Sequence, residues 1–179
     1  MTRAIDAFVR GLGTASALLT AVMVAVTVLV VVLRYLFGTG AIALQEVVVY
    51  AHACVIAFGL AYTLQTNGHV RVDLVYARLS TRTQRIIDLL GHLLFLLPVS
   101  AALLYLSFDY VAASWRIKEA SPEVGGLPAI YLLKTLIPIS AALLLLQGLA
   151  LIARIIGQLI SGDFGTAASA TNDRPGAEL

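Results

Sequence analysis

The sequence predicts an all-α integral membrane protein with four transmembrane helices. Of its 179 residues, 60% are hydrophobic and only 12% are charged, and the mean hydropathy is +0.93. A water-soluble domain carries roughly 25% charged residues. Four segments also reach the ~20 apolar residues that a helix needs to cross about 30 Å of hydrocarbon. They are too long and too uniformly apolar for the alternating strands of about ten residues that form membrane barrels.

The four predicted spans are residues 15–33, 44–64, 86–108 and 129–153, inside a membrane domain of residues 1–160. The first span follows two arginines, as a signal peptide does, but its apolar run is about twice as long as a signal h-region. Arg34 also follows where small residues at a cleavage site are expected, so we expect this span to remain as an anchor. Residues 161–179 are small and polar, which predicts a disordered cytoplasmic tail.

Two local signals refine the third and fourth spans. Thr81 and Gln84 have the spacing of a capping box, so the third helix is expected to begin near Arg82. Pro98 and Pro138 lie inside the third and fourth helices. Each removes a backbone hydrogen bond and is expected to bend its helix.

The basic residues predict the orientation, because Lys and Arg accumulate in short cytoplasmic loops. One side carries seven arginines and the other carries four basic residues. The seven are Arg3, Arg10, Arg71, Arg78, Arg82, Arg85 and Arg154, and the four are Arg34, Arg116, Lys118 and Lys134. Both termini are therefore predicted to be cytoplasmic. The net charge of +2 is too small to indicate nucleic acid binding.

The connection between the second and third spans allows two interpretations. If residues 71–85 formed one helix, their four arginines would share a face and bind anionic headgroups. If the third helix instead begins afresh near Arg82, the arginines only fix the topology.

Ionisable residues in a bilayer are costly, which makes them candidates for function. Arg34 closes the first span and Glu46 opens the second on the same side, so they could pair with each other or bind a partner. Lys134 lies about one turn inside the fourth span. It either extends to the interface or meets Glu119 or Glu123.

Two histidines also lie in the predicted spans. His52 is expected to be neutral and to form an interhelical hydrogen bond, rather than to bind a ligand. Asp88 and His92 are four residues apart, which favours a hydrogen-bonded pair near the cytoplasmic interface over a proton relay. Their number is too small for a metal site.

Small residues predict where the second helix packs. Ala53, Ala57 and Ala61 recur every four residues, and such a face lets another helix approach closely. We therefore expect a packing seam on this face.

Signatures of catalysis and of a substrate site are missing from the sequence. It has no Walker loop, nucleophile elbow, HExxH motif or cysteine and histidine cluster, and Cys54 is its only cysteine. It also lacks the paired interrupted helices that mark a transporter's own binding site. We expect no enzyme activity and no cofactor, and interpret the chain as an accessory membrane subunit.

Three stretches resemble a known family, over about residues 10–155. They are "RYLFG", "QEVVVYAHACVIAFGLAYTLQTNGHVRVDLVYARL" and "SPEVGGLPAIYLLKTLIPISAALLLLQG". Together they look like the small membrane subunit (DctQ-type) of a tripartite ATP-independent periplasmic (TRAP) transporter. The most specific element is "GHVRVD", with His69, Arg71 and Asp73. The family often has two adjacent acids at the opening of the second helix, of which this chain keeps only Glu46.

The resemblance implies a complex in the bacterial inner membrane. In it, a periplasmic binding protein captures an organic acid such as a C4-dicarboxylate, and a large permease subunit moves the acid with a sodium gradient. The small subunit would brace the large one against the lipid bilayer, and sodium would bind the large subunit rather than this chain. The alternatives are a stand-alone proton-coupled four-helix exporter and a small membrane enzyme that uses Asp88, His52 and His92.

Overall fold

The computed structural model describes residues 2–68, 76 and 78–162. Its helices are α1 (Thr2–Phe37), α2 (Ile42–Gln65), α4 (Thr81–Gly91), the π-helical turn η1 (His92–Leu96), α5 (Leu97–Ile117) and α6 (Ile130–Ser161). The elements α4, η1 and α5 follow one another without a break and form one long helix. Four helices are therefore long and apolar enough to cross a membrane, and the described residues contain no strand. The predicted fold class is confirmed.

The first and last helices extend beyond the predicted spans. Helix α1 begins at Thr2 instead of residue 15, because the polar segment before the span is itself an amphipathic helix. Its apolar residues Ile5, Val9 and Leu12 pack against the core, and Val9 is fully buried. Helix α6 continues to Ser161 and ends at Gly162, whose φ of 66° is the left-handed conformation common after a helix.

The third span begins at a serine cap. Ser80 has extended backbone angles and its Oγ accepts a hydrogen bond from the Thr83 N–H at 3.3 Å. The cap is thus one residue earlier than the predicted Thr81, while the Gln84 amide donates to the backbone oxygens of Tyr76 and Leu79 at 3.0 and 3.2 Å.

This start also distinguishes the two interpretations of residues 71–85. Residues 78–80 form a turn, so Arg78 is not on the helix that carries Arg82 and Arg85. A continuous helix over residues 71–85 is therefore wrong, and the interpretation in which the third helix begins afresh is the one that fits. Arg71 lies outside the described residues.

The two internal prolines are accommodated differently. Just before Pro98 the helix widens into the π-turn η1, in which the Leu97 N–H donates to the His92 carbonyl. Proline lacks an N–H and its ring crowds the carbonyl four residues earlier, and a π-turn relieves that conflict. Pro138 lies inside α6, which continues as a helix on both sides of it.

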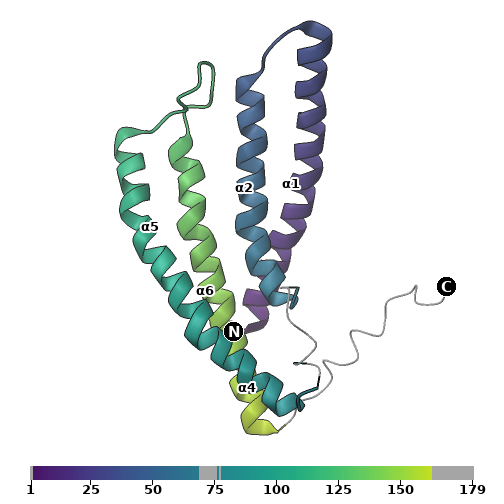
Figure 1. The fold of residues 1–179 in the computed structure, drawn as a ribbon, viewed down its shortest axis with the longest axis vertical. Helices are drawn as coiled ribbons and strands as arrows, with labels where there is room; N and C mark the ends of the chain where they lie inside the picture. The colour runs from purple at the N-terminus through teal and green to yellow at the C-terminus, as the bar shows by residue number, and fades with distance from the viewer. Residues whose placement is uncertain (1, 69–75, 77, 163–179) are drawn as a thin grey trace, which may run out of the picture.

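The four long helices run up and down as two hairpins, α1–α2 and α5–α6 (Figure 1). The short connections of residues 38–41 and 118–129 lie at one end of the molecule, which we call the connection end. The start of α1, the start of α4 and the end of α6 lie towards the other, which we call the terminal end (Figure 1).

Helix α6 is the centre of the bundle. In its most apolar stretch 39% of residues are buried, against 11% or less in the other spans. It approaches its neighbours through small residues: Gly148 lies so close to η1 that a Cβ there would be 2.8 Å from Leu96. Small side chains on α5, namely Ser100, Ser107 and Ser114, are also buried. Close approach of small residues is the usual way helices pack in membranes.

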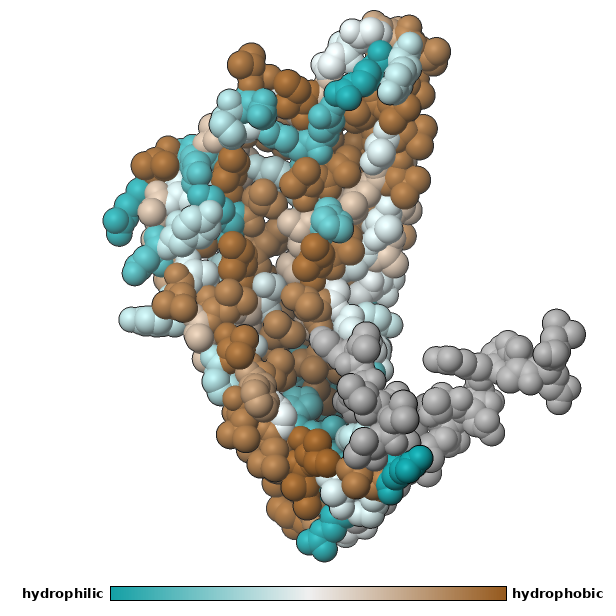
Figure 2. Space-filling view, in the orientation of Figure 1, coloured by the Kyte–Doolittle hydropathy of each residue, from teal (hydrophilic) through white to brown (hydrophobic). Residues whose placement is uncertain are grey.

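The outside of the bundle is apolar. Large side chains such as Leu18, Val24, Leu94 and Leu106 are each more than half exposed. Brown apolar atoms cover most of the face shown in Figure 2. A surface of this kind is stable against lipid or a partner subunit, and not against water.

Candidate functional site

Glu46 ties α2 to the α5–α6 hairpin at the connection end. One carboxylate oxygen accepts a hydrogen bond from the Ser121 hydroxyl, and the other accepts the Leu127 N–H at 2.5 Å. Both partners belong to the 118–129 connection. A side chain at Gly126 would displace both side chains of this contact, because a Cβ there would lie 2.6 Å from Ser121 Cβ and 2.7 Å from Glu46 Oε1. We call this contact the Glu46 bridge.

The Glu46 bridge shows that Glu46 does not pair with Arg34. Both carboxylate oxygens of Glu46 are directed to the 118–129 connection. Arg34 is exposed in the last turn of α1, and no ion pair links it to another described residue. The pairing that the short connection appeared to allow is not formed, because Glu46 faces the opposite hairpin.

Lys134 makes the ion pair that the sequence allowed. Its Nζ lies 2.5 Å from Glu119 Oε2 and 4.2 Å from the centre of the Tyr110 ring. This neighbouring ammonium lowers the pKa of the Glu119 carboxyl, which lies in the connection outside the spans. The backbone carbonyl of Glu119 also accepts the Ile130 N–H at 3.0 Å. Glu119 thus links both ends of the connection between α5 and α6.

Aromatic side chains close the same end of the α5–α6 hairpin. The Trp115 and Tyr131 rings meet edge to face, with centres 4.6 Å apart. Trp115 Nε1 donates to Thr135 Oγ1 at 2.9 Å, and Lys118 Nζ lies 4.5 Å from the centre of the Trp115 ring. Amphipathic rings of this kind are typical of the membrane interface.

The predicted alanine seam is closed over two of its three residues. Ala57 is 4% exposed and Ala61 is fully buried, the latter against Val9 of α1 and Leu143 of α6. Ala53 is only half-buried, and it lines a groove of about 470 Å³ between α2, α5 and α6. The small-residue face therefore brings α2 and α6 together towards the terminal end only.

His52 lies in this groove and corrects a prediction. Its side chain is exposed, and no hydrogen bond joins it to another described residue. The expected interhelical hydrogen bond is wrong because α2 and α6 separate at this level.

A polar contact that the sequence reasoning missed joins three helices at the terminal end. Arg154 Nη2 lies 3.0 Å from Asp6 Oδ1, and Gln147 Nε2 lies 3.4 Å from the same oxygen. Gln65 of α2 donates to the Asp6 backbone oxygen at 2.8 Å. Gln147 is fully buried. We call this set the Asp6 cluster.

The signal for the Asp6 cluster was present in the sequence. Gln147 is a lone amide within a long apolar run, and a buried polar group needs a partner. Asp6 was overlooked because the first helix was expected to begin after it.

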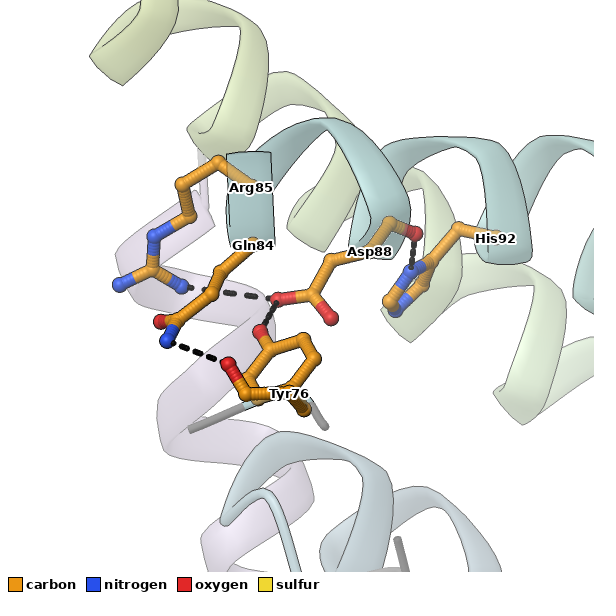
Figure 3. Close-up of polar contacts among 5 residues, drawn as sticks. All are labelled: Tyr76, Gln84, Arg85, Asp88 and His92. Carbon is orange, nitrogen blue, oxygen red and sulfur yellow. Dashed lines mark hydrogen bonds and ion pairs between the residues drawn. The ribbon is translucent and has the colours of Figure 1, made fainter. Parts of the chain in front are cut away.

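A second polar cluster lies where α4 begins (Figure 3). Asp88 Oδ2 accepts the Tyr76 hydroxyl at 2.8 Å and lies 3.9 Å from Arg85 Nη1. His92 Nδ1 lies 2.5 Å from the backbone oxygen of Asp88. The predicted contact between these two residues therefore involves the Asp88 carbonyl and not its carboxylate.

Several predicted features lie outside the described residues. They are His69, Arg71 and Asp73 of the "GHVRVD" element, and the tail from residue 163 onwards. In the described part, no three His, Cys, Asp or Glu side chains come close enough to hold a metal ion.

Comparison with known protein families matches most of the chain. The family described as tripartite ATP-independent periplasmic transporters, DctQ component, matches residues 23–158. No curated protein and no solved structure matches the chain. The matched range includes all of α2, α4, η1 and α5, most of α6, and α1 from residue 23 onwards.

Proposed function

Because this chain belongs to the DctQ family and is therefore the small permease subunit of a TRAP transporter, we propose that it braces the large permease subunit. The family is a transporter component and not an enzyme family, and the four helices indicate a multi-pass membrane protein. The observation that carries the bracing role is that both ends of the bundle are joined by polar contacts between hairpins.

A brace must keep its shape while its partner moves. The Glu46 bridge joins α2 to the α5–α6 hairpin at the connection end, and the Asp6 cluster joins α1, α2 and α6 at the terminal end. Buried Ala61 packs between α1 and α6 between these two points. Hydrogen bonds at both ends oppose sliding, and close packing opposes separation.

A bracing subunit also needs exposed surface that can contact the large subunit and the lipid. The exposed apolar side chains of α1 and α5 provide surface for both the bilayer and the large subunit. Arg34 is exposed at the end of α1, so we propose that it contacts a partner and not Glu46. His69, Arg71 and Asp73 are proposed for the same kind of role because they form the element most specific to the family.

The further features of the transport system follow from the family. We propose that a periplasmic binding protein delivers an organic acid such as a C4-dicarboxylate, and that a sodium gradient drives its uptake. Sodium is expected to bind the large subunit, and no cofactor is expected on this chain. The bacterial inner membrane is the proposed location, with both termini in the cytoplasm because the arginines gather on that side.

Deletion of this chain tests the proposal. Cells that lack it should lose sodium-dependent uptake of the acid, while the isolated binding protein should bind the acid as before. A plasmid copy of the chain should restore uptake. Uptake that continues unchanged without the chain would remove the bracing role.

A further inference from the structure

A small polar pocket lies at the terminal end, between the end of α2, the start of α4 and the last turns of α6. Its volume is about 170 Å³. Arg85 and Asp88 of α4, His92 of η1 and Arg154 of α6 contribute its charged and titratable lining. Two guanidinium groups therefore line the pocket, each with one carboxylate beside it: Asp88 near Arg85 and Asp6 near Arg154.

The pocket contains polar atoms that lack partners. In the described part of the chain, Arg85 Nε, Arg154 Nε and His92 Nε2 are buried and form no hydrogen bond. One other nitrogen of each arginine lies near a carboxylate: Arg85 Nη1 near Asp88, which also lines the pocket, and Arg154 Nη2 near Asp6. The Oε1 atom of Gln65, which also lines the pocket, is a fourth such atom and can accept a hydrogen bond. Buried polar atoms without partners are costly, so four of them around one pocket indicate a missing ligand with both acceptor and donor groups. Guanidinium groups are well suited to phosphate.

The position of the proton on His92 further limits which chemical groups the ligand can carry. A backbone carbonyl can only accept a hydrogen bond, so the Nδ1 beside the Asp88 oxygen carries the proton. In the neutral ring Nε2 is then an acceptor. A phosphate ester whose headgroup also carries a hydroxyl would satisfy the arginines and this nitrogen together.

An apolar groove lies next to the pocket. Its volume is about 630 Å³, it shares Asp88 and His92 with the pocket, and it continues past Phe95, Leu96 and Val99. The π-turn η1 supplies three of these residues, the first of which is His92. At about 1.5 Å per residue, the helix from Asp88 to Val99 covers roughly 16 Å, or about half of a ~30 Å hydrocarbon core. The groove therefore has the length of one leaflet.

We propose that one anionic glycerophospholipid binds here. Its phosphate lies between Arg85 and Arg154, and an acyl chain lies in the groove along η1 and the start of α5. A polar pocket and an apolar groove that share Asp88 and His92 match the two parts of such a lipid. A helix of the large subunit would fill the groove but would bring no phosphate to the arginines.

Native mass spectrometry of the full-length chain tests this inference. The chain is purified in a mild detergent and mixed with dioleoyl phosphatidylglycerol, with dioleoylglycerol, which has the same acyl chains and no phosphate, or with inorganic phosphate. We expect one phosphatidylglycerol to be retained, and at least tenfold less of the other two. If dioleoylglycerol is retained as well as phosphatidylglycerol, the phosphate does not bind the arginines and the headgroup assignment is wrong. If inorganic phosphate is retained as well as phosphatidylglycerol, the site does not require a lipid and the proposal is wrong.

Matched glycine variants test the position. Gly91 lines the groove and Gly157 does not, and a Cβ at either position meets nothing within 4 Å. Gly91→Leu should reduce phosphatidylglycerol retention at least tenfold, and Gly157→Leu should leave it unchanged. Equal retention by both variants would identify a nonspecific lipid and overturn the proposal.

A third variant and a partner control complete the test. Arg85→Gln should reduce the retention of phosphatidylglycerol at least fivefold. This variant tests the proposal even if Gly91→Leu fails to fold. Unchanged retention would contradict the phosphate site. Addition of the large permease should leave the lipid bound, so its release would show that the groove receives a protein helix instead.

Discussion

Ala61→Leu should weaken the bundle at its most closely packed point. Ala61 is fully buried between Val9 of α1 and Leu143 of α6, so the larger side chain has no free space. Overpacking of a filled core costs typically 1–3 kcal/mol, which is about 5- to 150-fold in the unfolding equilibrium. The matched control is Ala53→Leu, the same change two turns earlier in α2. Ala53 is half-buried beside a groove of about 470 Å³, which can receive the added atoms.

The assay is the free energy of unfolding in mixed micelles, measured on both variants under the same conditions. Ala61→Leu should lower it by about 1–3 kcal/mol, and Ala53→Leu should change it by less than about 0.5 kcal/mol. The packing argument is refuted if the two variants lose equal stability, or if Ala61→Leu loses none.

Three further predictions concern the polar contacts. Glu46→Gln removes the carboxylate that accepts hydrogen bonds from the Ser121 hydroxyl and the Leu127 N–H. The backbone amides of residues 118–129 should therefore exchange hydrogen faster than in the unmodified protein. Unchanged exchange would mean that the Glu46 bridge does not hold the connection in place. The pKa of Glu119 is lowered in the fold, so its contribution to stability is complete above its ordinary value of about 4.3 and is lost as the pH falls through the lowered pKa. Stability measured against pH should therefore decline in that acidic range, and Glu119→Gln should remove this part of the decline. Arg154→Ala leaves Asp6 without its cation. In the same assay it should lower the free energy of unfolding by about 1–2 kcal/mol, a moderate loss because the arginine is partly exposed. An unchanged free energy of unfolding would show that solvent replaces the arginine.

The helices were predictable from the sequence because apolar runs of this length have few other stable structures. Their ends were less predictable, because residues 2–14 are too polar for a hydropathy window to recognise. That segment becomes helical because its apolar side chains, Val9 above all, meet α2 and α6. The information lies in tertiary packing and not in the local sequence.

The polar contacts were the hardest to predict. Arg34 and Glu46 are close in sequence, yet Glu46 pairs with residues of the 118–129 connection instead. Asp6 and Gln147 form a hydrogen bond although they are 141 residues apart in the sequence. By contrast, Lys134 and Glu119 could be predicted, because a short connection limits which carboxylate the ammonium can reach. The partner roles proposed for His69, Arg71 and Asp73 stay predictions.

Reconstituted transport tests the bracing role most directly. Vesicles are prepared with the large permease subunit alone, with this chain alone, and with both, and each receives the binding protein, the acid and an inward sodium gradient. Only vesicles with both subunits should accumulate the acid. Accumulation at the full rate by the large subunit alone, or any transport by this chain alone, would contradict the account.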